Sequence, residues 1–338
     1  MRQLLNVKTL SIIGMQKNVG KTTVLNHIIK ELADKRIGIT SIGRDGEKED
    51  SVYFVDKPRI YVNEGTFVAT TNECLKNSSA KTEVIKKTGF NTPMGEVIIV
   101  KIIDTGFIDI AGPSFSEQIN EIITYLNDLV DIFIVDGAFS RKQIASNKFM
   151  EATILVTGAA YNKSLKRTVD DTYTTYKLLS LPIIQDQRIV QLINKYAVSL
   201  IDDEGSEYIF DLKSSLGNKE LIISKLSKSR KYLMISGALT AELVNQLIDN
   251  RNKLNKLTII IKDGTKAFID YDLYKKLNRI NVKLQVINQV NLVLLTYNPY
   301  SPYGYEYKDH EFKKLLEEKI DLPIINVLTA KGNNHGKT

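Results

Sequence analysis

Residues 10–23 of the chain read LSIIGMQKNVGKTT, an apolar run followed by a loop with Gly14, Gly20, Lys21 and Thr22. The run predicts a buried strand over residues 7–13, and residues 21–35 carry apolar side chains at helical spacing. A strand, a glycine-containing loop, a lysine and a hydroxyl residue at a helix start are typical of a phosphate-binding loop. Its backbone N–H groups and the positive end of the helix dipole face phosphate oxygens. The stretch therefore predicts a nucleoside triphosphate site.

Each residue type in this loop suits a separate contact. Lys21 is expected to reach the terminal phosphates and to act in catalysis, and the Thr22 hydroxyl is expected to hold Mg²⁺. The spacing departs from the common pattern, because five residues rather than four separate the glycines, and Met15 stands where the first glycine is expected. The predicted nucleotide-binding residues are Gly14, Lys17, Asn18, Val19, Gly20, Lys21, Thr22 and Thr23.

Three aspartates directly follow predicted strands, where the carboxyl ends of parallel strands form a common edge. Mg²⁺ takes oxygen ligands and in proteins usually only one or two carboxylates. We therefore predict Asp45 and Asp136, with Thr22, as metal-linked residues, and Asp45 and Asp104 as catalytic acids that orient the attacking water. Asp104 opens an Asp-Thr-Gly turn of the form that senses a γ-phosphate. The competing interpretation of each aspartate is an ordinary turn or cap acid.

Strands and helices alternate along the chain. Buried strands are predicted at residues 37–42, 97–103, 130–135 and 152–157, and helices at residues 114–126 and 164–179. This alternation favours an α/β fold with a mostly parallel sheet covered by helices, and residues 82–87 are expected to pair antiparallel with 97–103. A similar alternation resumes after Leu181-Pro182. We therefore predict a nucleotide-binding domain over 1–184, a second α/β domain for partner binding or regulation over 185–329, and a flexible tail over 330–338.

Composition excludes several classes of protein. Of 338 residues, 43% are apolar and 25% charged, which is ordinary for globular chains. No apolar run approaches the roughly 18 residues that span a bilayer, and the start lacks a signal peptide, so a cytoplasmic protein without membrane contact is expected. Cys74 is the only cysteine, which excludes an intrachain disulfide. The net charge of +7 comes from scattered basic residues without a nucleic-acid motif, so no nucleic-acid partner is expected.

The longer loop resembles that of dethiobiotin synthetases, in which five residues also separate the glycine from Gly-Lys-Thr. Val135-Asp136-Gly137-Ala138 is similar to a Val-Glu-Gly-Ala stretch at the same stage of that fold. The resemblance implies a P-loop NTPase of the dimer-forming branch, and hence a homodimer. The extra signature lysine of this branch would fall at Gln16 and is missing, with Lys17 one place away.

Several segments together resemble the P-loop subunit of lysine 5,6-aminomutase reactivase. They are residues 11–23, 40–47, 111–114, 298–305 and 323–327. Such factors use ATP to open an adenosylcobalamin-dependent aminomutase of lysine or ornithine and to release damaged cobalamin. The resemblance implies an ATPase subunit that works with a second, different ATPase subunit and with the mutase. It also implies that the second domain contacts one of these partners.

Other functions stay open. Dethiobiotin synthetases carry a Lys-Pro pair after the second strand for a carboxylated substrate, and Arg44-Asp45 at that place counts against a small-molecule synthetase. A nucleotide-gated adapter with little hydrolysis has no distinguishing sequence feature. Asn162-Lys163-Ser164-Leu165 lacks the aspartate of the guanine motif, which favours ATP over GTP. The aromatic, turn-rich segment 297–305 is either a partner-binding loop or a packed turn.

Overall fold

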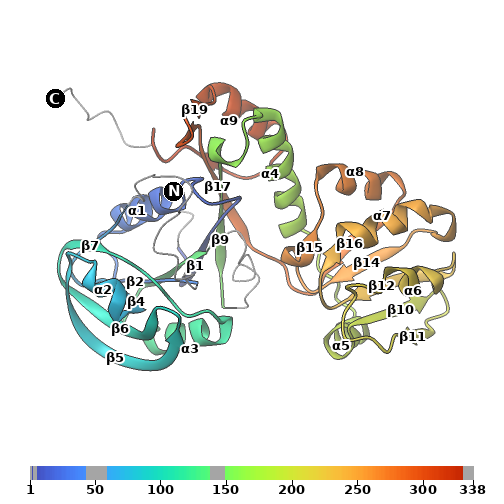
Figure 1. Cartoon of the computed structure of the whole chain (residues 1–338), viewed down its shortest axis with the longest axis horizontal. Helices are drawn as coiled ribbons and strands as arrows, with labels where there is room; N and C mark the ends of the chain where they lie inside the picture. The colour runs from blue at the N-terminus through green and yellow to red at the C-terminus, as the bar shows by residue number, and fades with distance from the viewer. Residues whose placement is uncertain (1, 3–5, 43–58, 138–148, 330–338) are drawn as a thin grey trace. The chain divides into compact units, whose positions relative to one another are not determined.

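The structure is a computed structural model that describes residues 2, 6–42, 59–137 and 149–329 (Figure 1). The chain divides into two compact units. The first unit comprises Met1–Val169 and Leu292–Thr338, and the second comprises Asp170–Asn291. Helix α4 (Leu165–Leu179) contains the first boundary between them.

The first unit is built on a nine-stranded sheet with the order β20-β17-β9-β1-β8-β2-β4-β6-β5. Neighbouring strands from β20 to β4 are parallel, β6 is antiparallel to β4, and β5 is antiparallel to β6. The expected α/β fold with a large, mostly parallel sheet is therefore confirmed, and so is the antiparallel β5–β6 pair. The strand bounds are β20 (Ile324–Ile325), β17 (Leu292–Asn298), β9 (Ala152–Gly158), β1 (Thr9–Gly14), β8 (Ile132–Gly137), β2 (Ile37–Ser41), β4 (Phe67–Thr71), β6 (Gly95–Asp104) and β5 (Lys81–Thr92).

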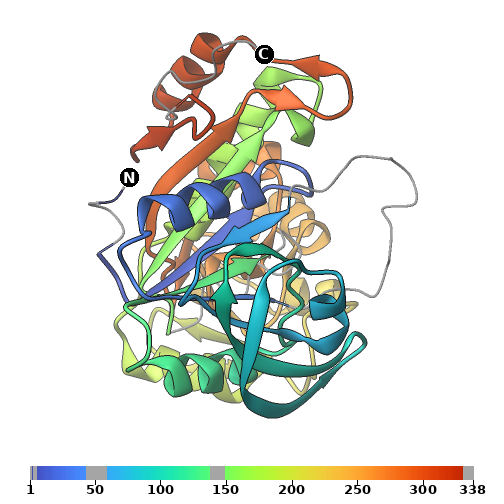
Figure 2. The ribbon, with the colours of Figure 1, turned by 90° about the vertical axis from the view of Figure 1, so that its left-hand side faces the viewer.

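The middle strands of this sheet are covered on both faces. Every residue of β1 and of β9 is buried, which matches their nearly continuous apolar sequences. The hydroxyls of Ser11 and Thr153 are hydrogen-bonded to each other at 2.7 Å, so their burial leaves neither without a partner. In Figure 2, α1 (Lys21–Glu31, blue) lies across one face of the sheet. Its apolar residues Val24, Leu25, Ile28 and Ile29 are buried.

Shorter elements complete the first unit. A two-stranded ribbon pairs β3 (Ile60–Val62) with β7 (Gly106–Ile108), and a hairpin pairs β18 (Tyr300–Ser301) with β19 (Tyr305–Glu306). The remaining helices are α2 (Asn72–Lys76), α3 (Ser116–Leu126), α9 (Asp309–Glu317) and the 3₁₀ turn η3 (Ala159–Tyr161).

The division of the chain differs from the predicted boundaries. Residues 292–329 were expected in the second domain, but β17 pairs with β9, with Leu295 opposite Leu155, and β20 pairs with β17. Both strands therefore extend the sheet of the first unit. Conversely, residues 170–184 group with the second unit. The apolar pattern of a strand identifies it as buried but carries no information about which distant strand it joins.

The second unit has its own five-stranded sheet, in the order β11-β10-β12-β14-β16. Strands β12, β14 and β16 are parallel, and β10 is antiparallel to β12 and β11. Asp186, Thr240 and Asp270 cap the N-termini of α5, α7 and α8 through their side-chain oxygens. The bounds are β10 (Val198–Asp202), β11 (Glu207–Ile209), β12 (Arg230–Ile235), β13 (Leu239–Thr240), β14 (Thr258–Ile261), β15 (Ala267–Phe268), β16 (Lys283–Val286), α5 (Gln187–Lys195), α6 (Lys219–Ser224), α7 (Ala241–Asp249), α8 (Tyr271–Arg279), η4 (Arg251–Lys253) and η5 (Gly264–Lys266).

Among the described glycines of the second unit, Gly264 has the least room for a side chain. This leads to a stability prediction. A Cβ at this position would lie 1.9 Å from the carbonyl oxygen of Leu178, so Gly264→Ala must displace backbone. We expect the substitution to lower the free energy of unfolding by about 2–3 kcal/mol. Gly237→Ala is the matched control, because a Cβ there meets nothing within 4 Å. Urea denaturation monitored by circular dichroism measures both, and equal midpoints for the two variants would contradict the prediction.

Candidate functional site

The loop between β1 and α1 is held at both ends by the sheet. The Met15 N–H donates to the carbonyl of Val156 on β9 at 2.8 Å, and the Met15 and Val19 side chains are buried. Asn18 and Gly20 have left-handed backbone conformations, with φ of 64° and 105°. Gly20 is the N-cap of α1 and has no side chain to cap the first helical N–H groups. The first turn, Lys21 to Thr23, contains no acidic residue, so this helix end suits an anion.

Lys21 runs back across Gly14. A Cβ built on Gly14 would lie 2.9 Å from both Cγ and Cδ of Lys21, so the absence of a side chain at Gly14 makes room for the lysine stem. The Lys21 Nζ donates to the carbonyl of Gln16 at 3.0 Å, which places the ammonium group over the loop. Burial lowers the pKa of Lys21, the charge of Asp136 raises it, and the charge of Lys17 lowers it.

Asp136 stands at the carboxyl end of β8, next to the strand that leads into the loop. It lies opposite Ile12 of β1 on one side and Ser41 of β2 on the other. Its Oδ1 is buried and accepts no hydrogen bond from the described residues. Burial raises the pKa of Asp136 to about 6, and the charge of Lys21 opposes this rise. A buried carboxylate oxygen that lacks a partner requires an explanation, and a bound cation supplies one.

The other predicted loop residues differ in exposure. Thr22 and Thr23 are half-buried in the first turn of α1, and Lys17 is exposed on the loop. The structure brings together Gly14, Lys21 and Asp136 at the carboxyl edge of β1 and β8, and Thr22 follows Lys21 in the first turn of α1.

Asp104 is not brought to this edge. Strand β6 runs antiparallel to β4, and Lys101 of β6 stands opposite Phe67, the first residue of β4. Asp104 therefore lies at the amino-terminal edge of the parallel strands, away from Gly14. Its exposed carboxylate is 3.4 Å from the Lys81 Nζ, in an ordinary surface ion pair. This position is inconsistent with the predicted γ-phosphate contact and catalytic role of Asp104.

Two other predictions fall on parts of the chain that are not described. Asp45, predicted as a catalytic and metal-linked acid, lies in residues 43–58, outside the described residues. The predicted tail 330–338 also lies outside them.

A segment from the C-terminal part of the chain lies beside the loop, which sequence reasoning did not assign to the site. Asn298 ends β17, and a Cβ built on Gly20 would lie 3.5 Å from the Asn298 Cβ and Nδ2. The Asn18 Nδ2 donates to the Tyr303 hydroxyl at 3.3 Å. The sequence signals for these residues were the aromatic, turn-rich segment 297–305 and the inclusion of 298–305 among the segments that resemble the reactivase subunit. That segment includes a packed turn against the loop, one of the two interpretations left open.

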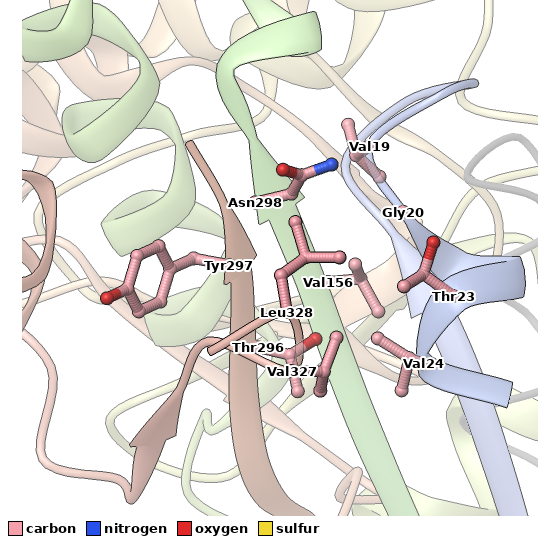
Figure 3. Close-up of a pocket in the computed structure, with 10 residues that line it drawn as sticks. All are labelled: Val19, Gly20, Thr23, Val24, Val156, Thr296, Tyr297, Asn298, Val327 and Leu328. Atoms are coloured by element: carbon pink, nitrogen blue, oxygen red, sulfur yellow. The ribbon is translucent and has the colours of Figure 1, made fainter. Parts of the chain in front are cut away.

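Figure 3 shows a hollow between the loop, α1 and β17, with the Asn298 amide turned toward Val19 and Gly20. The Thr296 Oγ1 on its wall is buried and has no hydrogen-bond partner among the described residues. The hollow is mostly apolar, and its empty volume of about 180 Å³ is smaller than the roughly 300–1,000 Å³ of typical small-molecule sites. Its lining residues are Val19, Gly20, Thr23, Val24, Val156, Thr296, Tyr297, Asn298, Val327 and Leu328.

Comparisons with known proteins do not identify the chain. No family model matches it, and neither a curated protein nor a solved structure gives a match. Across the described ranges, no helix combines the length and apolarity that crossing a bilayer requires. Within those same ranges, no three His, Cys, Asp or Glu side chains gather as a metal-binding cluster.

Proposed function

We propose that this chain is a P-loop NTPase that binds ATP with Mg²⁺ on residues 14–23 and hydrolyses it. One observation carries the proposal: at the start of α1 the Lys21 stem crosses Gly14, and the charge of Lys21 interacts with Asp136 on β8, whose buried Oδ1 has no hydrogen-bond partner among the described residues. A cation and a carboxylate at a helix N-terminus match what a Mg²⁺-bound polyphosphate requires of its site.

Different residues of the proposed site would contact different parts of the Mg²⁺-nucleotide complex. Backbone N–H groups of the loop and the start of α1 receive phosphate oxygens, and Lys21 turns from the Gln16 carbonyl to the terminal phosphates. Asp136 and Thr22 are the residues that would hold Mg²⁺, which when bound neutralises charge on the phosphates. Asp45 remains a predicted catalytic acid.

We further propose, from the resemblance stated above, that the chain is the ATPase subunit of a reactivating factor for a cobalamin-dependent lysine or ornithine aminomutase. In this role nucleotide binding favours one conformation and hydrolysis another, and the mutase binds the two with different affinity. A second, different ATPase subunit and homodimer formation belong to the same proposal. The second unit would carry the contact with a partner.

Titration of the purified chain with fluorescent ATP tests nucleotide binding. We expect saturable binding that requires Mg²⁺ and that ATP competes away better than GTP. Absence of saturable binding with Mg²⁺ present would exclude the proposed site.

ATP turnover separates the reactivase from its rivals. A reactivase subunit is expected to hydrolyse ATP and to bind an adenosylcobalamin-dependent aminomutase only in one nucleotide state. Binding of ATP without turnover, with or without the mutase, would favour an adapter. No mutase binding in any nucleotide state would reject the reactivase role but leave the nucleotide site intact.

A further inference from the structure

The hairpin β18–β19 has a polar contact with the loop that the proposed nucleotide site does not use. Its connecting residues include Tyr303, whose hydroxyl accepts a hydrogen bond from the Asn18 amide at 3.3 Å. Asn18 is half-buried and has the left-handed conformation, with φ of 64°. Asparagine adopts this conformation at a modest cost, so a side-chain contact that fixes Asn18 also fixes the course of the loop.

The hairpin itself is firmly attached to the first unit. The Tyr307 N–H donates to the Pro299 carbonyl at 2.9 Å, and the Tyr300 N–H donates to Asn298 Oδ1 at 3.0 Å. The buried Tyr307 hydroxyl lies 2.9 Å from Thr168 Oγ1 and donates to the Asn162 carbonyl. Tyr307 also packs edge-to-face on Phe312. Tyr303 is therefore presented to the loop from a fixed support.

Gly158 allows the end of β17 and the loop to approach each other closely. A Cβ on Gly158 would lie 2.8 Å from the Asn298 carbonyl oxygen and 3.1 Å from the Val19 carbonyl oxygen. Gly158 thus lets the end of β17 and the loop come together over β9. The hairpin begins directly after this contact, at Tyr300.

We propose that Tyr303 is a positioning residue for the phosphate loop, acting through Asn18 to hold the backbone of residues 17–20 in the conformation that receives phosphate. The inference rests on the proposed nucleotide site and adds to it a residue distant in sequence. A loop that is competent for only part of the time binds its ligand more weakly by that fraction. A loop held in advance avoids this loss.

Removal of the hydroxyl is the direct test. We expect Tyr303→Phe to weaken Mg²⁺-ATP binding by about 3- to 10-fold, the range for one neutral hydrogen bond. Tyr300→Phe is the matched control, because Tyr300 lies in the same hairpin and is 53% exposed. The control should bind ATP as the unmodified chain does, and both variants should keep the thermal unfolding midpoint.

A double-mutant cycle then tests the route through Asn18. Asn18→Gly keeps the left-handed backbone and removes the amide, so it should weaken binding to a similar extent. Addition of Tyr303→Phe to Asn18→Gly should cause no further loss. The positioning role would be overturned if the losses of ATP affinity in the two single variants multiplied in the double variant, or if Tyr303→Phe bound ATP as well as the unmodified chain. The nucleotide site would stay in place in either case.

Amide hydrogen exchange without nucleotide gives a readout that does not depend on ATP binding. The amides of residues 17–21 should exchange several-fold faster in Tyr303→Phe, and those of β1 and β9 should be unchanged. Equal exchange of residues 17–21 in both proteins would reject the proposal even if ATP binds. If the unmodified chain fails to bind ATP, the proposed function fails, and the exchange data alone then decide whether Tyr303 orders the loop.

Discussion

Replacing Lys21 with alanine should weaken Mg²⁺-ATP binding by about 100-fold, the upper end for one charge-assisted hydrogen bond. The substitution removes the ammonium group that lies over the loop and leaves Gly14 and the backbone of α1 in place. It also removes the positive charge that opposes the raised pKa of Asp136. The predicted loss therefore includes both the phosphate contact and a less readily ionised Asp136. Isothermal titration calorimetry at fixed Mg²⁺ measures it.

The control for this substitution is Lys30→Ala. Lys30 is exposed in the last turn of the same helix, so its removal changes the net charge equally but leaves the loop untouched. Affinity should change by less than about 2-fold, since distant exposed charges are screened by salt. Equal affinities of Lys21→Ala and the unmodified chain would show that the loop does not bind the phosphates.

The second large effect is expected from Asp136→Asn, which should stabilise the chain while strongly reducing the Mg²⁺ dependence of ATP binding. Burial raises the pKa of Asp136 from 3.8 to about 6, so the folded chain holds this proton more tightly than the unfolded chain. The asparagine keeps the shape of the protonated acid without its charge. At pH 7 the free energy of unfolding should rise by on the order of 2–3 kcal/mol.

The sign of the pH dependence follows from the raised pKa. Below about pH 4 the carboxyl is protonated in both states, and the unmodified chain and Asp136→Asn should be similarly stable. As pH rises from about 4 to about 6, only the unfolded state has released the proton, so the unmodified chain loses stability relative to the variant. Above about pH 6 the difference should be constant. Urea denaturation from pH 4 to 8 measures this difference.

Metal binding provides the other half of this test. Without this carboxylate, Asp136→Asn should show a much smaller increase of ATP affinity with Mg²⁺ than the unmodified chain, since Mg²⁺ in proteins usually takes only one or two carboxylates. Asp104→Asn is the control, because Asp104 forms an exposed ion pair with Lys81 and lies at the other edge of the sheet. A Mg²⁺ response in Asp136→Asn equal to that of the unmodified chain would remove Asp136 from the metal site.

Local features were predictable from the sequence. The strand, loop and helix around Gly14 and Lys21 follow from an apolar run, glycines and helical periodicity, and the structure has β1 and α1 at these places. Asp136 was predicted at the end of a buried strand, and the structure places it beside β1. These predictions succeeded because the determining interactions lie within one strand–loop–helix unit.

Features that depend on long-range pairing were not predictable. In sequence, the end of β6 looks like the end of any buried strand. Asp104 lies at the amino-terminal edge of the parallel strands because β6 is antiparallel to β4. Likewise, β17 could have joined either sheet on its local pattern. The contact between Asn18 and Tyr303 spans 285 positions in sequence and rests on that strand pairing. Local sequence patterns record burial and direction changes, but not which distant strand becomes a neighbour.

The return of β17 and β20 to the first sheet has a consequence for synthesis on the ribosome. Residues 170–291 emerge before Leu292, so the second unit can complete its five-stranded sheet while the first still lacks its last strands. Until Leu292–Asn298 emerges, β9, buried throughout in the finished chain, exposes an unpaired edge. A nascent chain stalled within the second unit would therefore display an apolar edge to chaperones, and the loop between β1 and α1 would acquire its Asn298 neighbour only after the whole second unit has emerged.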